Sequence, residues 1–283
     1  MKAPAFKKIV IVGLGLMGGS LAAAIRKNSP KTKVIGVARR RKTLDLALRN
    51  KWIHQGFLSV SEALEQADLV VICTPVDLTK RILKEVDRFS KRSVLVTDIG
   101  SVKSPICRFA KSKKWKSVRF VGAHPMVGSH EKGIEAARAN LYGAGLTILT
   151  GTKNQPGFQK ISTFWKAFSG KVIVMSPEQH DEKIAEISHL PHLISVCLAQ
   201  TPSNSAYAVA GTGFRDTSRL AQGDASVWAP IFLENKMAVL KAVRSFYSNL
   251  NHFESALKSK DSKKLTKILK QVAVRRRALS PLK

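Results

Sequence analysis

The sequence is short of cysteine and long apolar runs, and each shortage excludes a class of protein. Cys73, Cys107 and Cys197 are odd in number and far apart among 283 residues, which excludes a domain built on disulfides. Cys73 ends the apolar run LVVIC, where we expect a small buried thiol, and this cysteine usage predicts a reducing cytoplasm. No apolar run approaches the length that spans a membrane, and because the opening MKAPAFKK leads directly into the first expected strand we expect no signal peptide.

Acidic residues are also scarce: 19 Asp and Glu stand against 48 Lys and Arg, a formal net charge of +29. Such a balance can indicate nucleic-acid binding. The basic residues are scattered, however, with small clusters at Arg39–Lys42, Lys111–Lys116 and Arg275–Arg277, and aromatic residues do not alternate with them as a series of stacking platforms would. We interpret the charge as a general surface bias and expect neither a nucleic-acid nor a membrane partner. A nucleotide-sensing or nucleic-acid-associated binding protein stays as a remote alternative.

The most informative stretch is KIVIVGLGLMGGSLAAAIR near the start of the chain. Ile9 to Val12 has the pattern of a buried parallel strand, and a helix is expected at Leu21 to Ile25, after the glycines. Gly13 suits a tight turn, Gly15 a close approach to a pyrophosphate, and Gly18 close helix–strand packing. The helix N-terminus would add free N–H groups for the phosphates. A structural glycine-rich turn is the alternative. The strand–glycine–helix context favours a dinucleotide site whose contacts include Gly13, Gly15, Leu16, Met17 and Gly18.

The next predicted strand, Val34 to Val37, decides which dinucleotide is expected. An acidic residue at its end would bind a ribose 2′-OH, but Ala38 stands there, followed by Arg39, Arg40 and Arg41. Guanidinium groups suit a 2′-phosphate, so NADP is favoured over NAD. A solvated basic turn is the alternative interpretation. We also expect Thr74 and Pro75, at the end of another strand, to contact the cofactor.

Strands alternate with helices in the first part of the chain, and helices alone follow. The fold class predicted is α/β, a Rossmann-type doubly wound parallel sheet domain followed by an all-α domain. The boundary falls near Ser176, which gives a dinucleotide-binding domain at 1–175 and a helical substrate and dimerisation domain at 176–283. The expected strands are Ile9–Val12, Val34–Val37, Asp68–Cys73, Ser93–Thr97, Arg119–Ala123, Leu146–Leu149 and Val172–Val174.

Local signals predict several helix starts. Ser59 with Glu62 and Ser176 with Gln179 each fit a capping box, and Thr74-Pro75 fits an N-cap followed by the first helical residue. One long amphipathic helix is expected from Trp228 to Leu257. The tail after it is short and basic.

Three segments hold the unusual polar residues. Ser101 follows the strand that ends at Thr97, and its alternative role is a helix N-cap. His124 ends a predicted buried strand before a proline and is well placed as a general base; a core histidine bonded to backbone is the alternative. His189 and His192 flank Pro191, where a kink is expected. Two close histidines can suggest a metal, but no Cys or carboxylate at ligand spacing completes a site, so we expect none.

The segments GLGLMGGS, DIGSVK, GAHPMVGSHEKGIEAA, HDEKIAEISHLPH and GFRDTSRLAQGDASVW together resemble the prephenate/arogenate dehydrogenase family of tyrosine biosynthesis. The resemblance covers the chain from about Lys8 to Leu257. It implies a dinucleotide-binding domain followed by a helical domain that forms a homodimer. The expected activity is an NADP-dependent oxidative decarboxylation of prephenate, with arogenate as the alternative substrate. A β-hydroxyacid or imine-type dehydrogenase would not account for the HPMVGS and SHLPH segments.

The resemblance also implies roles for matching positions. His124 matches the catalytic histidine that bonds the ring hydroxyl of the substrate, and Ser101 matches a serine that orients both. His192 matches a histidine that lines the site. Arg219 matches the arginine that binds a substrate carboxylate, rather than Arg215, with Asp216 expected to hold it. Ser129 and His130 are expected at the substrate. His130 stands where some members carry glutamate, which leaves side-chain recognition open.

Overall fold

The computed structural model describes residues 6–128 and 131–279. Eight strands form one sheet in the order β3-β2-β1-β4-β5-β6-β7-β8. All the strands expected from the sequence are present, and the short strand β3 is an addition that no pattern indicated. The strands are β1 (Lys8–Val12), β2 (Lys33–Val37), β3 (Gln55–Phe57), β4 (Leu69–Ile72), β5 (Val94–Asp98), β6 (Val118–Met126), β7 (Leu146–Thr150) and β8 (Lys171–Met175).

The sheet is parallel except at one junction, so the expectation of a fully parallel sheet is wrong there. The first part of β6 pairs parallel with β5, and its last five residues pair antiparallel with β7. A parallel return needs a crossover, usually a helix. The segment between β6 and β7 contains no helix among its described residues, so the chain comes back in the opposite direction.

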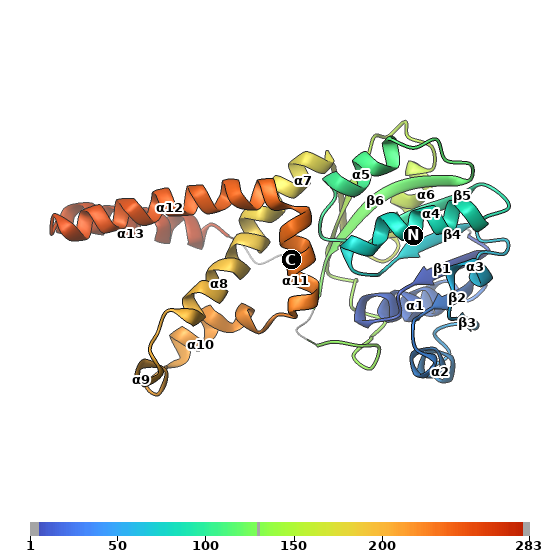
Figure 1. Cartoon of the computed structure of the whole chain (residues 1–283), viewed down its shortest axis with the longest axis horizontal. Coiled ribbons are helices and arrows are strands. Elements are labelled where there is room, and N and C mark those ends of the chain that lie inside the picture. Colours follow the sequence, from blue (N-terminus) through green and yellow to red (C-terminus); the bar gives the residue numbers. More distant parts are fainter. Residues whose placement is uncertain (1–5, 129–130, 280–283) are drawn as a thin grey trace.

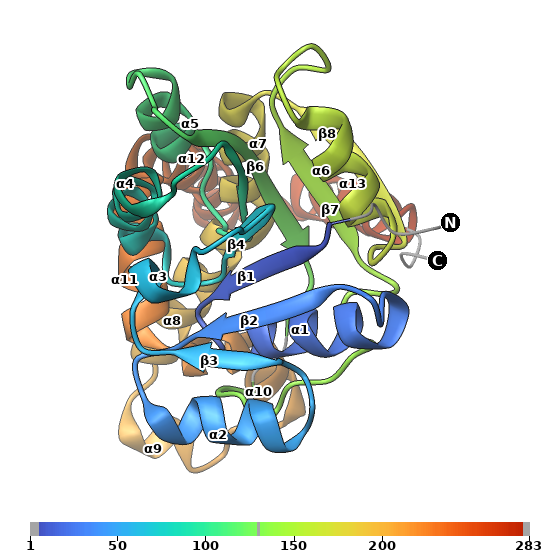
Figure 2. The same cartoon turned by 90° about the vertical axis from the view of Figure 1, so that its right-hand side faces the viewer.

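Alternation along β1 shows that both faces of the sheet are covered. Ile9 and Ile11 belong to one buried cluster, and Val10 and Val12 belong to another on the opposite face. Figure 2 shows helices on either side of the sheet. The first cluster includes residues of α1 (Leu16–Asn28), α2 (Arg41–Arg49) and α6 (Phe158–Lys166); the second includes residues of α3 (Val60–Ala63), α4 (Thr79–Phe89) and α5 (Ser104–Lys111).

After β8 the described chain is helical. The predicted capping box at Ser176 is confirmed: Gln179 N–H donates to Ser176 Oγ at 3.1 Å, and Ser176 N–H donates to Gln179 Oε1 at 3.2 Å. Figure 1 shows two arms leading away from the sheet, one made of α12 and α13 and the other of α8 to α10. The helices are α7 (Pro177–Ile184), α8 (Leu190–Gln200), α9 (Asn204–Tyr207), α10 (Thr212–Ser218), α11 (Ala225–Glu234), α12 (Lys236–Lys258) and α13 (Ser262–Arg277).

The kink expected at Pro191 takes the form of a π-helical turn, η2 (Ala185–His189), directly before α8. The Leu190 N–H donates to the Ala185 carbonyl, five residues back, and Pro191 then occupies the first turn of α8. Proline has no N–H to donate, so a break in the helical hydrogen-bond pattern at this point is expected. The wider turn shifts His189 and His192 relative to an unbroken helix.

Three local predictions are wrong. Ser59 makes no capping bond, and its hydroxyl lies 3.2 Å from Ser61 Oγ instead. Thr74 is not an N-cap: the following helical turn, η1 (Val76–Leu78), begins after Pro75, which is itself the capping residue. The helix expected from Trp228 to Leu257 is divided between α11 and α12 at Asn235.

Two further details differ from the sequence interpretation. Cys73 is half-buried, not fully buried, because it follows the end of β4 and lies against the glycine turn. The basic tail after Lys258 includes a regular helix, α13, whose first turn is capped by the Asp261 side chain.

Candidate active site

The turn between β1 and α1 has the shape that a dinucleotide needs. Gly13 has φ +99°, and a Cβ there would lie 2.8 Å from the Cys73 carbonyl oxygen. A Cβ on Gly18 would collide with the Gly13 carbonyl oxygen. At Gly15, in contrast, a Cβ would meet nothing within 4 Å. Helix α1 begins at Leu16 with no side-chain cap and no acidic residue in its first turn, so its N–H groups remain available to phosphate oxygens. These residues fit a dinucleotide.

The end of β2 lies against this turn, since Gly13 N–H donates to the Val37 carbonyl at 2.9 Å. Ala38 follows and is buried, and Arg39 and Arg40 are exposed. Arg41 differs from them, because its Nε lies 3.3 Å from Asp45 Oδ1 one helical turn later. Neither Arg39 nor Arg40 has an ion-pair partner among the described residues. The turn therefore presents two unpaired guanidinium groups near the glycine loop.

Thr74 also borders the glycine turn. Its Cγ2 lies 3.0 Å from the position a Cβ on Gly13 would take. The Thr74 hydroxyl donates to the Pro75 carbonyl at 3.4 Å, a long bond that leaves it accessible. Thr74 and the adjoining Pro75 are thus next to the loop that the sequence assigned to the cofactor.

His124 lies on β6 beyond the point where that strand pairs with β5, and it is buried. The neighbouring Ala123 N–H donates to Asp98 Oδ1 at 3.1 Å. Asp98 ends β5 and forms an ion pair with the ammonium group of Lys103, a lysine with no exposed surface. Ser101 stands between them in the chain and is half-buried. The ends of β5 and β6 thus bring His124 and the DIGSVK segment together.

A chain of hydrogen bonds leads from His124 into the helical half. His124 Nδ1 lies 2.8 Å from His180 Nε2, and His180 Nδ1 lies 2.7 Å from Asp181 Oδ1. The Asp181 carboxylate also accepts the N–H groups of Lys103 and Ser104, each at 2.7 Å. These bonds connect β6, α7 and the start of α5.

Burial and hydrogen bonding set the charges in this chain. Burial, with His180 and Lys103 nearby, holds the pKa of His124 well below its usual range, and burial also lowers the pKa of His180. Burial alone would raise the pKa of Asp181, but the bonds from His180 and two backbone N–H groups outweigh it and lower that pKa. Near neutral pH the two imidazoles are therefore neutral and the carboxyl group is ionised.

A second branch connects Asp181 to the π-helical turn. Asn235 Nδ2 donates to the Asp181 carbonyl at 2.9 Å and lies 3.1 Å from His189 Nδ1. Burial lowers the pKa of His189 to about 4, so its ring is neutral and its Nε2 is a buried atom without a hydrogen-bond partner. Asn235, the residue that interrupts the predicted long helix, is thus bonded within the site.

His192 is buried one turn further along α8. Its ring stacks on Trp228 of α11, with centroids 3.6 Å apart and planes 13° from parallel. Burial lowers the pKa of His192, and its Nδ1 has no hydrogen-bond partner. A Cβ on Gly223 would meet both rings, so glycine at that position allows the close packing.

Arg219 begins the 3₁₀ turn η3 (Arg219–Gln222), which packs against α8. Ser195 Oγ fixes this packing by donating to the Thr217 carbonyl and accepting the Ala221 N–H, each at 3.1 Å. Arg219 is exposed and makes no ion pair with Asp216 among the described contacts, so the expectation that Asp216 holds it is wrong: both side chains are exposed to solvent on this short turn. Arg215 instead donates to the Ala210 carbonyl at 3.3 Å.

The loop after β6 is joined to the helical half by an ion pair between Lys132 and Asp224, 3.0 Å apart. Asp224 is also the N-cap of α11, the helix that carries Trp228. Ser129 and His130, which the sequence assigned to the substrate, lie outside the described residues.

The sequence interpretation did not assign roles to several residues at this site. His180 and Asp181 were visible as a polar pair in the first turns of a capped helix, but that pattern is equally typical of a solvated helix start. Lys103 gave no signal of burial. Groups of three or more His, Cys, Asp or Glu able to hold a metal are not found in the described ranges 6–128 and 131–279. No role was assigned to Asn235, or to five residues inside the segments that carry the family resemblance: Asp98, Lys103, His180, Asp181 and Trp228.

Comparison with known proteins identifies this arrangement. Residues 21–174 match the sequence model of the prephenate dehydrogenase nucleotide-binding domain, and residues 176–271 match that of the prephenate dehydrogenase dimerization domain. The chain belongs to the prephenate dehydrogenase family. As a member of this family it is an oxidoreductase with a nucleotide-binding domain.

Individual relatives agree with this assignment. The prephenate dehydrogenase of Bacillus subtilis (strain 168) is 31% identical over 271 residues, 93% of this chain and 73% of that protein. The cyclohexadienyl dehydrogenase of Zymomonas mobilis is 29% identical over 286 residues, 97% of this chain and 96% of that protein. The crystal structure of A. aeolicus prephenate dehydrogenase, in complex with hydroxyphenyl propionate and NAD⁺, matches with TM-score 0.89 and 31% identity over 98% of this chain and 99% of that chain.

Proposed function

We propose that this protein catalyses the NADP-dependent oxidative decarboxylation of prephenate to 4-hydroxyphenylpyruvate. The observation that carries the proposal is a neutral, buried His124 at the carboxyl end of the sheet, the edge at which the glycine turn would hold a dinucleotide. Membership of the prephenate dehydrogenase family supports it independently.

His124 is the proposed proton acceptor. A neutral imidazole can take the proton of the ring hydroxyl while the carbon that bears this hydroxyl loses hydride. The bound cofactor would supply the hydride acceptor. The ketone formed is conjugated to the carbon that carries the carboxylate, so the electrons of the breaking C–C bond enter the ring as CO₂ departs. The aromatic product bears a hydroxyl, so the proton held by His124 returns to that oxygen. His124 therefore stores one proton and gives it back.

The other residues bind and orient the substrate. We assign to Arg219 the substrate carboxylate, because its guanidinium is exposed, unpaired and suited to bidentate hydrogen bonding. Ser101 is assigned to the orientation of the substrate hydroxyl and His124, and His192 to the wall of the site, where Trp228 fixes its ring. Ser129 and His130 are proposed at the substrate because they belong to the segment GAHPMVGSHEKGIEAA, which resembles the family.

For the cofactor we favour NADP. Ala38 provides no carboxylate to bind a ribose diol, and Arg39 and Arg40 are exposed and unpaired at the end of β2. The A. aeolicus relative was crystallised with NAD⁺. The direct comparison of the two cofactors is therefore part of the functional test.

A second substrate, arogenate, is supported by the similarity to a cyclohexadienyl dehydrogenase along nearly its whole length. We also propose that the sheet and helical parts, 1–175 and 176–283, are separate domains and that the helical one forms a homodimer. The helical part matches a dimerization domain. Large apolar side chains on α12 are exposed, including Met237 (78% exposed) and Leu257 (63% exposed).

The test is to mix purified protein with prephenate and either NADP⁺ or NAD⁺ and to follow the absorbance of the reduced nicotinamide, with arogenate in parallel. We expect turnover on prephenate, and a loss of about 10²- to 10⁴-fold in kcat for His124→Asn with cofactor affinity retained. Near-normal kcat in that variant would remove His124 from the mechanism. Turnover on arogenate alone would mean that arogenate, and not prephenate, is the substrate. No turnover on either compound would overturn the proposal.

A further inference from the structure

The residues hydrogen-bonded to His124, directly or through His180, carry one negative charge that no ion pair within residues 6–128 and 131–279 balances. Lys103 and Asp98 form an ion pair and neutralise each other. His124, His180 and His189 are neutral at pH 7 because burial lowers each pKa. The Asp181 carboxylate is ionised and receives hydrogen bonds only from neutral donors. This buried cluster therefore has a net charge of −1 and can accept one proton without becoming a buried cation.

The chain of bonds also fixes where each proton sits. The ionised Asp181 can only accept, so His180 Nδ1 must carry the hydrogen that bonds to it at 2.7 Å. A neutral ring has one N–H, so His180 Nε2 is an acceptor. His124 Nδ1, 2.8 Å from it, must therefore be the donor. His124 Nε2 is then left with a lone pair.

We propose that His180 and Asp181 are positioning residues for the proton transfer at His124. They hold His124 in the tautomer whose Nε2 can accept the hydroxyl proton. The inference rests on the proposed function only for the identity of that hydroxyl; the tautomer belongs to the free protein.

The same chain stabilises the protonated state that follows. When His124 Nε2 takes a proton, the positive charge forms within two hydrogen bonds of the Asp181 carboxylate, with His180 between them. The hydrogen bond from His124 Nδ1–H to His180 Nε2 strengthens. No covalent bond within these residues breaks. Because the reaction returns the proton to the product oxygen, the protein needs a temporary store and not an exit to water. A buried cluster of net charge −1 meets that need.

The first experiment reads the tautomer without substrate. Protein labelled with ¹⁵N-histidine is examined by long-range ¹H–¹⁵N correlation spectra near pH 7, with His124→Asn used to assign the His124 signals. We expect a protonated Nδ1 and an unprotonated Nε2 for His124, with His180 in the same tautomer. A His124 protonated at Nε2 would overturn the inference.

The second experiment uses two amides that separate the bonds of His180. Glutamine reaches about as far as histidine Nε2, so His180→Gln retains an acceptor for His124 but loses Asp181. Asparagine reaches about as far as Nδ1, so His180→Asn keeps a donor to Asp181 but loses His124. We expect His180→Asn to lower kcat by about 10- to 100-fold with little change in KM, and His180→Gln to lower it less.

Because asparagine is smaller than glutamine, a role in packing could also make His180→Asn the worse variant, so the His124 tautomer is read in each folded variant as well. Equal kcat values, or a His124 tautomer unchanged in His180→Asn, would overturn the inference. The spectra keep the test valid even if a variant does not fold. The failure of the proposed function is a separate result: a wild-type protein that oxidises neither prephenate nor arogenate would refute the function, while a protonated His124 Nδ1 would still support the hydrogen-bond chain.

Discussion

Histidine is used in this protein mainly as a buried neutral base. Four of the seven histidines in the sequence, His124, His180, His189 and His192, lie in or beside the candidate site and are buried. Each has a pKa lowered by burial. Keeping these rings neutral makes the folded state sensitive to acid.

We predict that the free energy of unfolding falls as the pH drops from about 6.5 toward 4. A histidine in the unfolded chain has a pKa near 6.5, and His189 in the folded protein has a pKa of about 4. Between these values the unfolded state binds more protons, so stability is lost as the pH falls. Each ring that stays neutral contributes a slope of up to ~1.4 kcal/mol per pH unit.

Urea unfolding at pH 7, 6 and 5 measures this slope. His189→Gln should reduce the slope of the unfolding free energy against pH by the contribution of one histidine. His252→Gln, at an exposed position on α12, should leave the slope unchanged. A stability that is constant from pH 7 to 5 would contradict the assignment of neutral buried rings.

The arginines after β2 allow a matched test of the cofactor. Replacing both Arg39 and Arg40 with alanine should lower kcat/KM with NADP by about 10- to 1,000-fold and leave kcat/KM with NAD nearly unchanged. Only NADP has a 2′-phosphate, and the double substitution removes the guanidinium groups that would bind it. Arg41→Ala is the control, since that side chain pairs with Asp45. Equal kcat/KM of the wild-type protein with the two cofactors would show that this basic turn is solvated surface and does not select NADP.

At the residue scale, the sequence could predict groups defined by their position in the chain. His124 was predicted at a strand end followed by proline; β6 instead continues through Pro125 to Met126, and His124 lies beyond the last residue that pairs with β5. The partners of His124 could not be predicted, because His180 and Asp181 reach it from 56 and 57 positions further along the chain through the packing of α7 on the sheet. The Asp216–Arg219 pair shows the opposite error, since two residues close in the sequence need not be in contact.

At the scale of elements, the glycines of the turn between β1 and α1 differ in how much space surrounds each Cα. We predict that Gly18→Ala lowers stability and cofactor binding together, because its Cβ would collide with the Gly13 carbonyl. Gly15→Ala should fold normally, since a Cβ there meets nothing within 4 Å, but its methyl group would take space needed by the pyrophosphate.

Thermal unfolding and calorimetric titration with NADP⁺ distinguish the two variants. The expected result is a lowered Tm for Gly18→Ala and an unchanged Tm with weakened binding for Gly15→Ala. Full cofactor affinity in Gly15→Ala would show that this open space is not where the phosphates bind.

Caps and strand directions show what local patterns can and cannot predict. Ser176 and Ser59 begin similar capping sequences, but of the two only Ser176 caps a helix, because the Ser59 hydroxyl bonds to Ser61 Oγ instead of a backbone N–H. The pattern supplies a possible acceptor, and the length of the helix depends on tertiary packing. The antiparallel β6–β7 pair was missed for the same reason: alternation identifies a strand without giving its direction.

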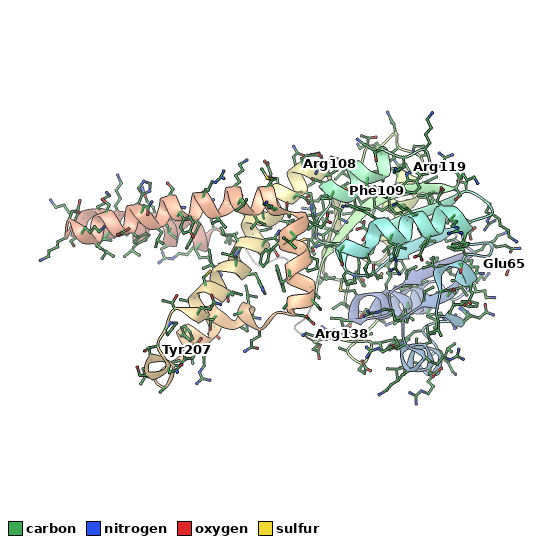
Figure 3. All side chains as sticks on the ribbon, viewed as in Figure 1. Glu65, Arg108, Phe109, Arg119, Arg138 and Tyr207 are labelled. Carbon is green, nitrogen blue, oxygen red and sulfur yellow. The ribbon has the colours of Figure 1, made fainter. Side chains whose placement is uncertain are left out.

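At the scale of the whole molecule, positive charge is spread over the surface. Figure 3 shows side chains projecting from all parts of the ribbon, and the labelled Arg108, Arg119 and Arg138 lie on α5, on β6 and on the loop after β6. Such a distribution attracts anions in general, and both prephenate and NADP are anions. None of the described helices is long and apolar enough to cross a membrane.

The two arms of the helical half in Figure 1 enclose little apolar interior. The cluster that packs this half has Ala185, Val239 and Ala242 as its buried members, whereas the sheet is covered by large clusters on both faces. If a second copy supplies the missing interior, unfolding is also dissociation, and stability follows mass action. The melting temperature should then rise with protein concentration, with ~1.4 kcal/mol gained per dimer for each tenfold increase. Calorimetry across a hundredfold dilution series measures this, and a Tm independent of concentration would mean that each chain is stable alone.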